Sequence, residues 1–173
     1  ARIVKDFDEF KRNLNLYVIS TNASGKLTPS NTTLKNNVKN WIGPYKMVND
    51  TVDILDAEIV NFGIKYQINL EANANRYTVI NRANARLAKF YAKNQFDIGE
   101  PLLLSDVYRE LLKVKGVLDV YDVQMIPKQG GRYSESNYDF QSNLSADGKM
   151  INAAETTIFE LKFPNIDIQG TIR

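Results

Sequence analysis

The sequence predicts an α+β fold, in which helices pack on one face of a largely antiparallel sheet. Three observations lead to this prediction. Residues 60–71 alternate between apolar and polar side chains, as expected of a strand with one buried and one solvated face. Residues 30–42 and 75–93 repeat apolar side chains at helical spacing. The predicted order is strand, helix, strand, two helices and strand, followed by a long loop and a terminal pair of strands.

The first predicted elements are a strand over residues 14–20 and a helix that follows a short glycine-containing loop. Ser30 is the predicted N-cap of this helix, and Gly43 is predicted to end it in the left-handed conformation. The apolar stripe of the helix consists of Leu34, Val38, Trp41 and Ile42. For Trp41 we expect packing in the core, and the alternative is an exposed anchor for a partner.

Two more helices are predicted after the alternating strand. Asn75 caps the first of them, whose inward stripe is predicted to be Tyr77, Ile80, Ala83, Leu87, Phe90 and Tyr91. Ser105 is predicted to cap the second helix, and Gly116 to stop it. Its apolar face consists of Val107, Tyr108, Leu111 and Val114. A strand is expected over residues 117–125.

The character of the chain changes after Pro127. Residues 129–149 form a long polar and aromatic loop, which in a compact domain is functional or disordered. Strands are expected again from residue 157 and over residues 166–172, with Pro164 between them. We therefore divide the chain into an α+β domain, residues 1–126, and a loop with a C-terminal β extension, residues 127–173. The sequence leaves open whether the extension belongs to the same domain.

The composition excludes several classes of function. The 22 basic and 20 acidic residues leave a net charge of only +2 without a dense basic cluster, so no nucleic-acid partner is predicted. The chain has no cysteine and no histidine, which removes disulfides, thiolate metal sites and the commonest general base. No apolar run is long enough to cross a bilayer, so no membrane partner is predicted.

Two acidic segments are candidate cation sites. The first consists of Asp53, Asp56 and Glu58. Strand geometry places Asp53 on the opposite face from the other two, which favours a solvated strand entry. Residues 143–148 resemble the start of a calcium loop but lack its first Asp and have Glu155 one position too late. We therefore predict no metal site, no cofactor and no catalytic residue.

A succession of short motifs runs through most of the chain. It consists of Tyr17-Val18-Ile19-Ser20, Gly25-Lys26-Leu27, Pro29-Ser30, Gly43-Pro44, Gly99-Glu100-Pro101-Leu102, Ser105-Asp106 and Val114-Lys115-Gly116-Val117. This succession resembles the baseplate J-like family of contractile-tail phages and related injection machines. It is most similar to the C-terminal part of the wedge subunits of the T-even-type branch. The resemblance covers residues 14–125 for the broad family, and residues 127–173 match only the T-even-like branch.

The resemblance implies a non-enzymatic structural protein of the virion, located in the tail baseplate and assembled in the host cytoplasm. Such a protein pairs with itself in homodimer contacts and binds other baseplate wedge proteins. Together they form the ring around the central hub and maintain it during sheath contraction. The resemblance implies no cofactor and no small-molecule substrate.

We expect the intersubunit contacts in the aromatic loop and in the terminal strands, which offer an edge for strand addition. The predicted interface residues are Tyr133, Tyr138, Phe140, Phe159, Leu161, Phe163, Ile166 and Ile168. The alternative function is a monomeric carbohydrate-binding or adhesin-type recognition module that uses the same loop aromatics. A hydrolase is the weakest alternative, because no convergent nucleophile and base can be named.

Overall fold

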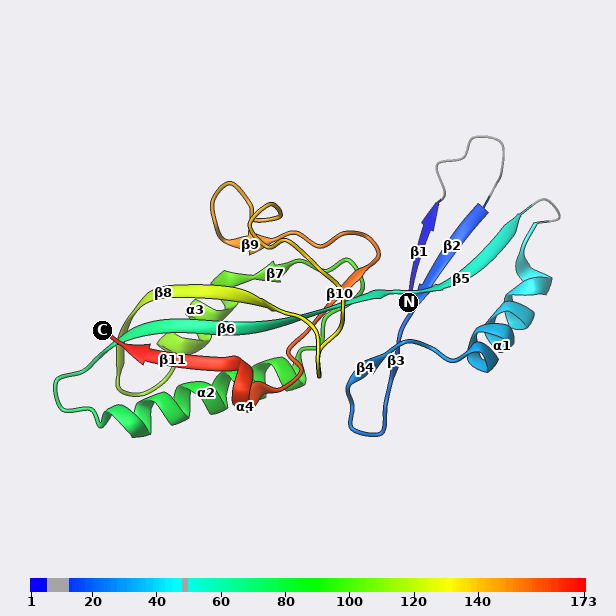
Figure 1. Cartoon of the computed structure of the whole chain (residues 1–173). Helices are drawn as coiled ribbons and strands as arrows, with labels where there is room; N and C mark the ends of the chain where they lie inside the picture. The colour runs from blue at the N-terminus through cyan, green and yellow to red at the C-terminus, as the bar shows by residue number, and fades with distance from the viewer. Residues whose placement is uncertain (6–12, 48–49) are drawn as a thin grey trace.

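The computed structural model describes residues 1–5, 13–47 and 50–173, and it confirms the α+β class. The elements follow in this order: β1 (Arg2–Lys5), β2 (Asn13–Val18), β3 (Ser20–Thr21), β4 (Leu27–Thr28), α1 (Thr32–Ile42), η1 (Gly43–Tyr45), β5 (Thr51–Asp56), β6 (Glu58–Leu70), α2 (Arg76–Lys93), β7 (Leu102–Leu103), α3 (Leu104–Leu112), β8 (Val117–Lys128), β9 (Met150–Ile151), β10 (Thr157–Glu160), α4 (Pro164–Asp167) and β11 (Ile168–Ile172). The molecule is elongated, with a small N-terminal sheet at one end and a larger sheet at the other (Figure 1).

The two sheets are joined by one nearly continuous strand, because only Ala57 separates β5 from β6. In the small sheet the order is β1-β2-β5, with β1 antiparallel and β5 parallel to β2. Helix α1 makes the crossover between β2 and β5. In the larger sheet β6 is central, with β8 antiparallel along one edge and β10 and then β11 parallel along the other. The sheet is thus mixed, and its longest pairing is antiparallel.

The core lies between the larger sheet and helices α2 and α3, which cover one of its faces (Figure 1). The predicted alternation of β6 is confirmed, since its inward side chains Val60, Phe62, Ile64, Tyr66 and Ile68 are all buried. The buried stripe of α2 consists of Val79, Ala83, Leu87 and Tyr91. Our prediction of Tyr77 in this stripe was wrong. Tyr77 is 82% exposed, because the buried residues follow a strict four-residue spacing that begins at Val79.

The opposite face of β6 is not solvated along its whole length as predicted. Asn61 and Gly63 are buried there. A β-carbon on Gly63 would lie 2.7 Å from Cε of Lys128 and 2.9 Å from the carbonyl oxygen of Asp167, so that side chain and α4 cover this end. The C-terminal 127–173 segment therefore packs onto both faces of the sheet that residues 58–126 begin.

Pro127 does not end β8, which continues to Lys128 and corrects the predicted end at residue 125. The backbone N–H of Glu58 donates to the carbonyl of Thr156, directly before β10. Because backbone groups alternate along a strand, the N–H and C=O of Phe62 also point to the β10 side of β6. Pro127 is paired with Phe62, and its nitrogen therefore faces the outer edge of the sheet. A proline is tolerated at such an edge position because no ladder bond is lost.

The predicted cap of α2 is confirmed: the Asn75 side chain accepts a bond from the Thr78 N–H at 3.2 Å. Gly116 has a left-handed φ of +97°, but it does not stop α3 as predicted, because that helix ends at Leu112 with Lys113 as its C-cap. Gly43 is different from our prediction: its φ of −45° and ψ of −48° are right-handed, and α1 continues into η1. Ser105 also differs from the prediction: the N-cap position of α3 is Leu103, two residues earlier, and it provides no side-chain cap.

The first helix is capped by Asn31 and not by Ser30 as predicted. The Asn31 side chain accepts a bond from the Leu34 N–H at 2.7 Å. Ser30 is buried, and its N–H donates to Asp56 on β5 at 2.9 Å. Both residue types cap helices well, so the tertiary bond to Asp56 decides between them.

Candidate interaction surfaces

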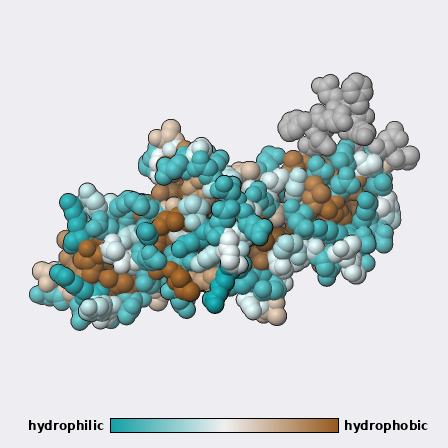
Figure 2. Space-filling model, in the orientation of Figure 1, coloured by the Kyte–Doolittle hydropathy of each residue, from teal (hydrophilic) through white to brown (hydrophobic). Residues whose placement is uncertain are grey.

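The small sheet and α1 enclose little core, and helix α1 has no buried residue. A groove of about 220 Å³ lies between this sheet and the end of α1, lined mainly by Ile3, Leu14, Ile42, Tyr45, Met47 and Val52. We call it the apolar groove. Tyr45 and Met47 are 77% and 67% exposed, although large apolar side chains are usually buried. Figure 2 shows hydrophobic residues gathered over this sheet.

Trp41 extends this apolar surface. Our expectation that Trp41 packs in the core was wrong: it is 70% exposed, and its ring lies 5.4 Å from that of Tyr45, centroid to centroid. The helical stripe is present, but the contact with Tyr45 of η1 leaves the Trp41 ring largely uncovered. A role for Trp41 as an anchor for a partner therefore stays a prediction, now with the required exposure.

Helix α1 is attached to the small sheet in part by ion pairs. Lys35 bonds Asp56 at 2.6 Å, and Lys39 lies 3.9 Å from Asp53. Two members of the acidic cluster, Asp53 and Asp56, are thus engaged by lysines of α1. Within residues 1–5, 13–47 and 50–173, no three acidic side chains converge in a way that could hold a metal ion.

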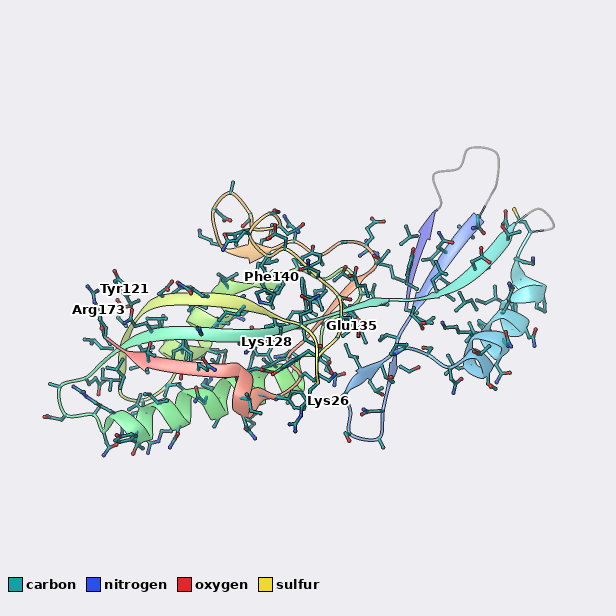
Figure 3. All side chains as sticks on the ribbon, in the orientation of Figure 1. Lys26, Tyr121, Lys128, Glu135, Phe140 and Arg173 are labelled. Carbon is teal, nitrogen blue, oxygen red and sulfur yellow. The ribbon has the colours of Figure 1, made fainter. Side chains whose placement is uncertain are left out.

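Four of the eight predicted interface residues are buried in the chain's own core. They are Phe140, Phe159, Leu161 and Ile168. Phe159 is 1% exposed and packs edge-to-face against Phe62 and Phe140, at centroid distances of 6.4 and 6.1 Å. Phe140 comes from the aromatic loop, and Figure 3 shows where it meets the body of the molecule. The apolar character of these four residues serves packing within the chain, so their side chains offer no exposed surface to a partner.

Three more of the predicted residues, Tyr133, Tyr138 and Phe163, are half-buried. The Tyr138 hydroxyl donates to the Asn152 carbonyl at 2.7 Å, and its ring packs on Phe159. The rings of Tyr133 and Phe163 pack edge-to-face at 5.5 Å. The aromatic loop is therefore fastened to the domain by its tyrosines. Only Ile166, at 56%, is strongly exposed among the eight.

Asp167 is the polar centre that fastens the first part of this loop. It is 2% exposed and accepts bonds from the Tyr133 hydroxyl at 2.5 Å and the Phe163 N–H at 2.9 Å. Lys128 lies 3.8 Å away. Burial and the bond to Asp167 raise the pKa of Tyr133 to about 12, so its hydroxyl stays a donor at neutral pH.

The structure also contains a cleft of about 420 Å³ at the junction of the two sheets, which the sequence did not indicate. It is lined by the β3–β4 turn, the end of α2 and β10, and includes Lys26, Leu27, Phe96, Ile98, Ile158 and Phe159. We call it the junction cleft. Figure 3 places Lys26 on the turn that faces the larger sheet. The residues that form it are up to 163 positions apart, from Ala1 to Pro164, so no local pattern could have revealed it.

One buried carboxylate holds the walls of the junction cleft together. Glu160 on β10 accepts a bond from the Leu27 N–H at 2.8 Å and one from the Asn61 side chain at 2.9 Å. The Asn61 oxygen in turn accepts the Ser134 N–H at 2.7 Å. This network ties the β3–β4 hairpin, β6, β10 and the aromatic loop to one another.

No protein-family model matches the chain, and a search of curated proteins found no match. The likeness to the baseplate J-like family therefore stays a prediction from the motifs. In the part of the chain that the structure describes, no helix is long and apolar enough to cross a membrane.

Proposed function

We propose that this protein is a structural subunit of a contractile-tail baseplate wedge. In this role it associates with itself and with other wedge proteins to build the ring around the central hub, and maintains the ring during sheath contraction. The succession of short motifs between Tyr17 and Val117 supports the assignment to a contractile-tail baseplate. The observation that carries self-association is the apolar groove, with the exposed side chains of Trp41, Tyr45 and Met47 beside it.

The physical case starts from the small sheet. A three-stranded sheet with one helix that buries no residue has little hydrophobic stabilisation of its own. Tryptophan, tyrosine and methionine are the residues that interface cores favour. Apposing the same surface of a second copy across a two-fold axis would cover both grooves at once. A stable interface buries about 1,600 Å² in total, which requires the whole groove and its rim.

Self-association is tested by sedimentation over a concentration series. We expect the wild-type chain to dissociate on dilution, and the triple variant Trp41→Ser, Tyr45→Ser, Met47→Ser to be monomeric throughout. Tyr77→Ser is the matched control, because it removes an even more exposed aromatic side chain from α2. A wild-type chain that is monomeric at every concentration would contradict this part of the proposal.

Binding to purified wedge proteins of a contractile-tail phage tests the remaining part. We expect at least one wedge protein to be retained by the immobilised chain. Retention of none would refute the assignment to a baseplate even if the chain pairs with itself. The alternative of a carbohydrate-binding module gains no support, since Phe140 is buried and Tyr133 and Tyr138 are bonded within the chain.

A further inference from the structure

A small pocket lies where the end of α2 meets the start of α3. Its volume is about 60 Å³, and the residues that line it include Phe90, Tyr91, Phe96, Glu100 and Asp106. We call it the aromatic pocket. Tyr91 and Phe96 also line the junction cleft, whereas the two acidic residues line the aromatic pocket only. The aromatic pocket therefore combines three aromatic rings with two carboxylates.

A buried hydroxyl in this pocket has no partner. Tyr91 is 9% exposed, and its hydroxyl forms no hydrogen bond within the described part of the chain. Burial, and to a smaller extent the charge of Asp106, raise the pKa of Tyr91. The hydroxyl is thus neutral and lies near that carboxylate. Because buried polar groups are nearly always hydrogen-bonded, we expect a group from outside the chain to bind this hydroxyl.

The surroundings of the hydroxyl favour a positively charged ligand. Among the described residues, Glu100 has no cation within ion-pair distance. Asp106 is partly compensated by Arg109 at 2.8 Å and by the start of α3, so Glu100 supplies most of the free negative charge. The C-cap of the 18-residue helix α2, Asn94, lines the pocket as well, and this end of the helix dipole is negative. The faces of the aromatic rings also attract cations.

The size of the pocket selects one kind of cation. About 60 Å³ is the share of roughly two water molecules in the liquid, which suits a primary ammonium and its adjoining methylene. A guanidinium or a trimethylammonium group has more heavy atoms and is too large. Pro101 and Leu103 complete the lining, and Leu103 is 36% exposed. This apolar rim can cover the methylene stem of a lysine side chain.

We propose that the aromatic pocket binds the ammonium group of a lysine side chain from a partner protein. The ammonium packs against the aromatic rings and donates hydrogen bonds to Glu100 and to the hydroxyl oxygen of Tyr91, while Asp106 adds attraction. The pocket shares no lining residue with the apolar groove. The inference therefore does not rest on the proposed self-association, and each is tested by its own measurement.

The probe is N-acetyl-lysine methylamide, titrated into the full chain at neutral pH and followed by NMR. We expect saturable chemical-shift changes, and none with the uncharged norleucine analogue. The arginine and trimethyl-lysine analogues should bind at least about fivefold more weakly, because they are too large for the pocket. Methylammonium tests for a free small amine as the ligand. It should also bind at least about fivefold more weakly, because it lacks the stem that the rim covers.

Two variants and a matched control locate the binding. Glu100→Gln should weaken the lysine probe at least about fivefold, and Tyr91→Phe about threefold or more. Glu135→Gln, the same charge change at an exposed position outside the pocket, should have no effect. Glu100 is itself exposed, so Glu100→Gln keeps the test valid even if Tyr91→Phe fails to fold.

Nuclear Overhauser contacts provide a readout of the position of the probe. The lysine methylenes should show contacts to the ring protons of Phe90. The proposal is overturned if no saturable change occurs, if Glu100→Gln leaves binding unchanged, or if the contacts map to the apolar groove or the junction cleft. Binding of the norleucine analogue or of methylammonium as tight as that of the lysine probe would overturn it as well.

Discussion

Gly170 on β11 is a position where the fold tolerates no side chain. It is paired with Tyr66 on β6, and a β-carbon at position 170 would lie 2.4 Å from both Cζ and Oη of that tyrosine. The ring cannot easily move aside, because it is 2% exposed and its hydroxyl donates to Asn84 on α2 at 2.7 Å. We therefore predict that Gly170→Ala destabilises the protein.

The magnitude follows from two opposing effects. Forcing an extra carbon into a packed site destabilises by about 1–3 kcal/mol. Replacing glycine by alanine also restricts the unfolded chain, which offsets about 0.4–1 kcal/mol. We expect a net loss of about 1–2 kcal/mol, or a melting temperature lower by roughly 2–8 °C at this chain length. Gly43→Ala is the control, since its φ is helical and, apart from its chain neighbours, no atom would lie within 4 Å of an added β-carbon. The next residue is Pro44, which disfavours a helical alanine and offsets the gain from restricting the unfolded chain, so this variant should differ from the wild type by less than about 1 kcal/mol.

Urea denaturation followed by circular dichroism measures both variants. A double-mutant cycle with Tyr66→Leu isolates the steric contact, because Gly170→Ala should lose most of its effect once the ring is absent. We expect a coupling free energy of about 1–2 kcal/mol. The steric account is refuted if Gly170→Ala is as stable as the wild type, or if the coupling lies within about 0.5 kcal/mol of zero.

Three further predictions concern other side chains. Trp41→Ala should reduce the free energy of unfolding by less than about 1 kcal/mol at low protein concentration, since the indole is largely exposed, and a larger loss in a thermal melt would contradict this. Tyr133→Phe should destabilise by about 1–3 kcal/mol in urea, because buried Asp167 loses its hydroxyl donor; unchanged stability would argue against that bond. The bond from Lys113 lowers the pKa of Glu110 below its usual 4.5. The ionised carboxylate therefore stabilises the folded state fully above its unfolded-state pKa, and this stabilisation is lost as the pH falls through its folded-state pKa. Glu110→Gln should therefore be less stable than the wild type by about 1–2 kcal/mol near neutral pH and equal to it in acid, and a difference independent of pH would disprove this.

Features that depend on near neighbours in the chain were predictable. The alternation of residues 60–71 identified β6, Asn75 marked the start of α2, and Gly116 marked a left-handed turn. Each of these signals acts over a few residues, through strand pleating, capping of free N–H groups or the left-handed conformation of glycine. For the same reason the α+β class could be predicted from the sequence.

The predicted site fared differently, because burial depends on neighbours that are distant in the sequence. Phe140 and Phe159 were chosen as interface residues from their apolar character, and they lie in the core. Trp41 was placed in the core from the same kind of pattern, and it is exposed. The junction cleft had no local signal at all, since its walls come from three separate parts of the chain.

By itself the sequence determined which segments pair or coil and which of their faces are apolar. The tertiary structure alone decided which of those faces are covered. The physical reason is that hydrophobic burial is non-directional and depends on the area removed from water, so an apolar stripe specifies no partner. Helix α2 packs beside β11 and helps to close a core, whereas Trp41 at the end of α1 contacts Tyr45 of η1 and remains 70% exposed.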